Sequence, residues 1–175
     1  MKHIEVSTRA LSSLINDVNK GKFDFEHPFQ RKSDQWSPIM KSKLVDSAIR
    51  CYPIYPILVE EYDNGVLGVI DGKQRLTVLA SYFNNEFALH KTLLPVDIDG
   101  TTYQISGKKL AERKRQKESD TKNQRGRTPK VPKYLDEDVV DRLKNLEIQI
   151  YKLKKPTEDD IREIFARINS SKGLN

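Results

Sequence analysis

Residues 66–83, VLGVIDGKQRLTVLASYF, decide how this chain folds. A β-rich run at 66–70 ends at Asp71-Gly72, a dipeptide that is typical of a tight turn. Apolar residues then recur at helical spacing, at Leu76, Leu79, Ala80, Phe83 and Phe87. The stretch therefore predicts a strand, a tight turn and a helix over 73–87.

The turn also carries the residues most suited to chemistry. A helix start presents backbone N–H groups without partners in the helix, together with the positive end of the helix dipole, so it favours a phosphate. Gly72 lets the backbone approach a ligand closely, while Lys73 and Arg75 add positive charge. Asp71 is placed to hold Mg²⁺ or to orient a water molecule, because hard cations prefer carboxylate oxygens. The alternative is that Asp71-Gly72 is only a turn and N-cap, and that both cationic side chains are solvated.

Outward from this unit, the other elements follow from apolar periodicity, N-cap residues and turn dipeptides. Helices are predicted from an N-cap at Ser7 to Gly21, from Ser37-Pro38 to Cys51, at 137–143, and through 161–168 after a capping box at Thr157. Strands are predicted at 23–25, 57–62, 93–98, 101–105 and 146–151, and 27–36 is predicted to be a loop. This order predicts a single mixed α+β domain over 1–175, with a small mixed sheet flanked by helices.

Two further segments carry candidate ligand-binding residues. In the loop, Gln30 and Arg31 could clamp a phosphate while the nearby Trp36 stacks on a base; alternatively, Trp36 anchors the loop to the core and Arg31 is solvated. Near the C-terminus, FARINSSKGLN runs from a helix into a Ser/Gly turn and includes Arg167 and Asn169. On the residues alone, Asn169 need do no more than end the helix.

Charge is unevenly distributed along the 175 residues. The chain has 31 Lys and Arg against 25 Asp and Glu, a net charge of +6. Residues 108–133 contain eleven of the cationic residues and three acids, so the remainder carries a net charge of −2. We expect 108–133 to be a mobile, basic insertion that binds DNA; the alternative is a solvated, disordered loop.

Composition also excludes several classes of protein. Cys51 is the only cysteine, so the chain has no internal disulfide, and no histidine has a neighbouring cysteine at zinc-ligand spacing. The chain has no apolar run of membrane-spanning length and no apolar secretion signal, so we expect a cytoplasmic protein without a membrane partner.

Three blocks in order, PFQR…W, VIDGKQRLTVL and EIFARINSSKGLN, resemble the N-terminal domain family of GmrSD-type restriction endonucleases. The resemblance spans roughly 7–107 and 134–175. It implies a ParB/sulfiredoxin-like fold in which the strand, turn and helix of the central block bind phosphate groups. By position, Asp71, Gln74 and Arg75 match the DGQQR signature of that family and are the candidate catalytic residues.

The resemblance extends the candidate site. Gly72, Lys73 and Thr77 of the central block, Gln30, Arg31 and Trp36 of the first, and Arg167 and Asn169 of the last are the candidate cofactor-binding residues. Lys73 stands where the family usually has Gln, a change that could strengthen phosphate contact or alter hydrolysis. Relatives often carry a large C-terminal nuclease region, so an end directly after the last block suggests a fragment, a split gene or a minimal version with a separate nuclease partner.

The resemblance implies a nucleotide-binding, NTP-hydrolysing, DNA-associated module of a modification-dependent restriction or anti-phage system, with an NTP of unknown identity and Mg²⁺ as cofactors. Two alternatives stay open. The chain could be a non-catalytic DNA-binding or regulatory module, or a ParB-like DNA nickase that uses Asp71 and needs Mg²⁺ but no nucleotide.

Overall fold

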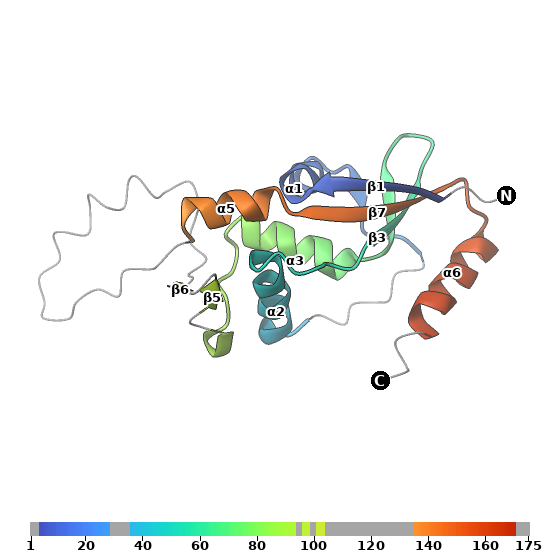
Figure 1. Ribbon diagram of the computed structural model, residues 1–175. Coiled ribbons are helices and arrows are strands. Elements are labelled where there is room, and N and C mark those ends of the chain that lie inside the picture. Colours follow the sequence, from blue (N-terminus) through green and yellow to red (C-terminus); the bar gives the residue numbers. More distant parts are fainter. Residues whose placement is uncertain (1–3, 29–35, 94–95, 99–100, 104–134, 171–175) are drawn as a thin grey trace, which may run out of the picture.

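The computed structural model describes residues 4–28, 36–93, 96–98, 101–103 and 135–170 (Figure 1). The main sheet has five strands in the order β1-β7-β3-β4-β2: β1 (Ile4–Ala10), β2 (Phe23–Asp24), β3 (Ile57–Glu61), β4 (Leu67–Asp71) and β7 (Glu147–Lys154). Its helices are α1 (Leu11–Asn19), α2 (Pro38–Ile49), α3 (Lys73–Phe83), α5 (Glu137–Lys144) and α6 (Glu158–Ser170), with a short 3₁₀ turn η1 (Lys91–Leu93). A separate antiparallel pair consists of β5 (Val96–Ile98) and β6 (Thr101–Tyr103). The predicted mixed α+β class is confirmed.

The main sheet is mixed in direction and covered on both faces. β1 and β4 run antiparallel to their neighbours β7 and β3, whereas β3 with β7 and β2 with β4 are parallel pairs. Along β3, Ile57 and Val59 pack in the larger core with α1, α2, α3 and α5, whereas Leu58 packs on the opposite face near α6. The four helices and α6 therefore lie on opposite faces of the sheet.

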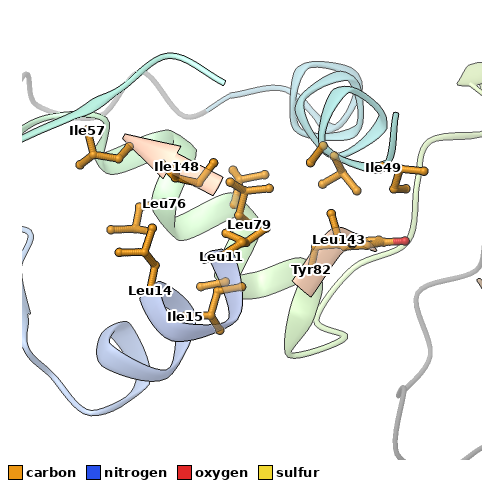
Figure 2. Packing of buried hydrophobic residues seen from close by; sticks show 14 of the residues in the cluster. Leu11, Leu14, Ile15, Ile49, Ile57, Leu76, Leu79, Tyr82, Leu143 and Ile148 are labelled. Atoms are coloured by element: carbon orange, nitrogen blue, oxygen red, sulfur yellow. The ribbon is translucent and has the colours of Figure 1, made fainter. Parts of the chain in front are cut away.

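The larger core forms around α3. Leu11 and Leu14 of α1 point toward Leu76 and Leu79 of α3, and Ile57 of β3 lies beside Leu76 (Figure 2). These side chains are at most 2 % exposed, so α3 is fixed to both the sheet and α1. Its first turn is consequently held in one place at the edge of the core.

Glycine is required at the turn from β4 into α3. Gly72 has φ +103°, in the region that side chains of L-residues rarely adopt. A Cβ built at this position would lie 2.6 Å from Ile57 Cδ1 and 3.1 Å from an Arg75 guanidinium nitrogen. The backbone thus passes directly over Ile57 as it enters the helix.

Most predicted elements are confirmed. The hairpin of β3 and β4 turns through Gly65 at φ +78°, and Ser37 Oγ accepts a hydrogen bond from the Met40 N–H at the start of α2. The capping box of α6 is reciprocal, since Thr157 N–H donates to Asp160 Oδ2 at 3.0 Å and Asp160 N–H donates to Thr157 Oγ1 at 3.2 Å. No helix in the described ranges combines the length and apolar character needed to span a bilayer.

Three predicted boundaries are wrong. The strand predicted over 93–98 does not include Leu93, which ends the 3₁₀ turn η1. Ser7 is not a helix cap but the middle of β1, which pairs along its whole length with β7; α1 starts at Leu11 instead. The third helix ends at Phe83, because Asn85 takes a left-handed conformation at φ 60°. Phe87 still contributes to packing, with its ring centroid 5.6 Å from that of Tyr82.

Gly72→Ala tests the close approach at the turn. We expect the free energy of unfolding to fall by about 2 kcal/mol or more, because backbone strain and the contact with Ile57 add together. Gly65→Ala is the matched control, since Gly65 also has a positive φ but a Cβ added there would meet no atom within 4 Å. Denaturant unfolding of both variants measures the difference; equal losses would contradict a steric role for Ile57.

Candidate functional site

Asp71 and Arg75 meet across the Gly72 turn. Asp71 is the last residue of β4 and Arg75 lies in the first turn of α3. The Nη2 atom of Arg75 donates both to Asp71 Oδ2, at 2.7 Å, and to the Pro56 carbonyl, at 3.0 Å. The guanidinium therefore links the end of β4, the start of α3 and the segment that enters β3.

The residues that the structure describes do not satisfy every donor of the Arg75 guanidinium. The side chain is only 13 % exposed, and its Nε–H is buried without a hydrogen-bond acceptor among the described residues. Leaving such a donor unpaired costs about 1–3 kcal/mol, so an unpaired buried donor calls for an explanation such as a ligand. Arg75 belongs to the first turn of α3, where the first backbone N–H groups also lack partners within the helix.

Lys73 is held by a neighbouring segment. Its ammonium donates to the Phe25 carbonyl at 2.7 Å and lies 3.2 Å from Glu26 Oε1. Since the Glu26 side chain is 89 % exposed, the carbonyl contact is the better shielded of the two. Lys73 thus ties the chain that follows β2 to the start of α3, and a phosphate would have to compete with the Phe25 carbonyl for its charge.

A polar cluster fixes that segment on the sheet. Tyr62 Oη donates to Asp24 Oδ2 at 3.0 Å, and His27 Nε2 lies 2.8 Å from Glu60 Oε1. Gly68 pairs with both Asp24 and Glu60, so the two carboxylates lie in one row across β2, β4 and β3. Burial and the Asp24 carboxylate raise the pKa of Tyr62 to about 12, so its hydroxyl remains a donor at neutral pH.

Gln74 and Thr77 lie on another side of α3. Both line a cavity of about 220 Å³ between α3, Lys41 of α2 and the segment at Phe87. The Thr77 hydroxyl donates to the Lys73 carbonyl at 2.9 Å, as often happens within helices. Within the described residues, neither side chain joins the contact of Asp71 with Arg75.

The other two sequence blocks are only partly described. Trp36 is half-buried and packs against the larger core, as its anchoring interpretation predicts. Arg167 is exposed on α6 and pairs with Glu163 at 2.6 Å, beside a cleft of about 960 Å³ that includes Ile4 and Leu153. Asn169 belongs to the last turn of α6. Gln30, Arg31, the segment 108–133 and residues 171–175 lie outside the described residues.

The donor set gives limited support for a metal. No group of three or more His, Cys, Asp or Glu side chains that could hold an ion occurs within the described ranges. Asp71 offers one carboxylate, of which Oδ2 already accepts from Arg75. Mg²⁺ is commonly held by one or two carboxylates together with substrate phosphates, so Asp71 fits an ion that arrives with a nucleotide.

Sequence reasoning missed the backbone acceptors of this site. The carbonyls of Pro56 and Phe25 hold Arg75 and Lys73, respectively. Carbonyl groups leave no signature in a sequence because every residue has one. For the Pro56 carbonyl, the sequence offered one indirect signal: Pro53 and Pro56 indicate that this segment does not continue α2.

Comparison with known proteins identifies the family. Residues 11–175 match the family described as GmrSD restriction endonuclease, N-terminal domain. No curated protein and no solved structure gives a significant match. The family match includes the strand, the Gly72 turn and α3, together with both flanking blocks. The chain therefore belongs to the GmrSD restriction endonuclease N-terminal domain family.

Proposed function

We propose that the Gly72 turn binds the phosphates of a nucleoside triphosphate and that the chain hydrolyses it, as a DNA-associated module of a modification-dependent restriction or anti-phage system. The observation that carries this proposal is the buried Nε–H of Arg75 at the start of α3, which has no acceptor among the described residues. A phosphate oxygen is an acceptor that suits both this donor and the free N–H groups of the helix start.

Each residue of the turn has a distinct role in this proposal. The backbone N–H groups of the first turn of α3 and the Arg75 guanidinium bind the phosphates and stabilise negative charge that develops during transfer. Asp71 holds the guanidinium in place through its 2.7 Å contact. Gln74 lies on the side of α3 that faces α2, outside the contact of Asp71 with Arg75, so it has no step in this proposal.

Mg²⁺ enters the proposal only with the nucleotide. When bound, it would neutralise charge on the phosphates, and Asp71 is the described carboxylate beside the turn that could contact it. The roles of Arg75 and the helix start do not depend on it, because they contact the phosphates directly.

Arg75→Ala and Asp71→Asn test the site through phosphate release from ATP, GTP and CTP in the presence of Mg²⁺. We expect each variant to lose about a hundredfold or more in rate for the nucleotide that the wild type hydrolyses, since a preorganised charge contact is removed.

Arg50→Ala is the matched control. Arg50 forms a comparable i,i+4 ion pair with Asp46, at 3.0 Å, but it lies at the end of α2. We expect this variant to hydrolyse at the wild-type rate. Unchanged hydrolysis in Arg75→Ala, or an equal loss in Arg50→Ala, would show that the site has been assigned wrongly.

A second function is favoured by the charge distribution. With eleven cationic residues and three acids in 108–133, this segment could attract a DNA backbone without any contribution from the turn. In that case the chain acts as a DNA-binding or regulatory module, alone or beside a nuclease partner.

Replacement of 108–133 by a short Gly/Ser linker separates the two functions. We expect DNA affinity to fall and its dependence on salt to weaken, because fewer counterions are released on binding, while NTP hydrolysis stays unchanged. Lys154→Ala/Lys155→Ala, which removes two cations from the body of the domain, should alter the salt slope far less. Equal loss of DNA binding and hydrolysis on removal of the segment would contradict the assignment of DNA binding to 108–133 and of hydrolysis to the Gly72 turn.

A further inference from the structure

The segment between α2 and β3 carries an exposed tyrosine next to the residue whose carbonyl holds Arg75. The Pro56 carbonyl accepts the 3.0 Å hydrogen bond from Arg75, whose guanidinium we propose binds phosphate. Tyr55 directly precedes Pro56 in the chain. Tyr55 is 80 % exposed. A large aromatic face thus lies open to solvent, one residue along the chain from the carbonyl that holds Arg75.

The backbone on both sides of Tyr55 is fixed. Ile54 packs against the larger core and Ile57 is buried within it, so the neighbouring residues anchor the chain while Tyr55 faces outward. Pro53 and Pro56 further restrict the backbone of this short segment. An exposed ring on a fixed backbone can bind a flat partner at little cost in conformational entropy.

Three other aromatic residues already have partners. Phe25, whose carbonyl holds Lys73, stacks on Phe23. Trp36 packs against the larger core, and Tyr52 interacts with Arg50 through hydrogen bonding and charge. Within the described part of the chain, Tyr55 has no hydrogen bond or ring contact. It therefore remains free to stack on a ligand.

We propose that Tyr55 stacks on the base of the nucleotide whose phosphates lie at the Gly72 turn. This inference rests on the proposed function. It moves base recognition from Trp36, for which the sequence left both stacking and core anchoring open, to the segment that enters β3. Because stacking reads the face of a ring and not its edge, Tyr55 strengthens binding of any nucleotide and favours the larger face of a purine.

Binding to the full chain is measured by calorimetry with three probes: the β,γ-imido analogues of ATP and GTP, and inorganic tripolyphosphate, which has no base. We expect Tyr55→Ala to weaken the tighter-binding analogue about tenfold or more and to leave tripolyphosphate affinity unchanged. Tyr55→Phe, which keeps the ring, should retain the affinity of the wild type. Tyr52→Ala is the matched control, since Tyr52 is also exposed in the same segment, and it too should bind all three probes as the wild type does.

Three outcomes would overturn the inference. Unchanged nucleotide affinity in Tyr55→Ala would show that the ring is not used. An equal loss for tripolyphosphate would show that the substitution disturbs the phosphate site instead of a base contact. If the wild type binds neither the analogues nor tripolyphosphate, the proposed phosphate site itself is wrong. If it binds tripolyphosphate but the Tyr55 substitution has no effect on the analogues, only the base contact is wrong.

Discussion

The close approach of the backbone at Gly72 to Ile57 is the constraint on which the other features of the site depend. Because Ile57 is buried between α3 and the sheet, the chain can leave β4 and enter α3 only if residue 72 has no side chain and a positive φ. This turn directs the unpaired N–H groups of the helix start beyond the end of β4. It also brings Arg75 back toward Asp71, so one geometric requirement places both the backbone donors and the guanidinium.

The charged side chains around the turn are held by contacts of very different kinds. Arg75 is shielded and shared between Asp71 and a carbonyl, and its buried Nε–H has no acceptor in the part of the chain that the structure describes. Lys73 has a carbonyl and an exposed carboxylate as partners and reaches a segment held by the Tyr62 and His27 contacts. An exposed ion pair that salt screens contributes little to stability or to ligand binding. A shielded donor without an acceptor among the described residues destabilises the free protein, and a ligand that accepts from it removes that cost. For this reason Arg75, and not the more exposed Lys73, is central to the proposed function.

Much of the fold follows from local sequence signals. The Asn64-Gly65 hairpin, the Ser37-Pro38 helix start and the Thr157 capping box are each specified by neighbouring residues, and each occurs as predicted. β1 was missed because its pairing partner, β7, lies about 140 residues away and its seven residues look locally like the approach to a helix. In the site, too, neighbouring residues were predictable from the sequence and distant ones were not. Asp71 and Arg75 were each selected from the turn sequence, although their contact with each other was not predicted, whereas the Pro56 and Phe25 carbonyls come from segments that only the folded chain brings near.

If the start of α3 binds phosphate through its backbone N–H groups and Arg75, a phosphate without a base should bind there too. A titration of the isotope-labelled chain with inorganic pyrophosphate, followed by amide and arginine Nε–H resonances in two-dimensional NMR, tests this without any assumption about base or hydrolysis. We expect saturable shifts confined to Lys73, Gln74 and the backbone and Nε–H of Arg75. Shifts that avoid these resonances, or that occur only at exposed cations such as Lys154 and Lys155, would contradict phosphate binding at this turn.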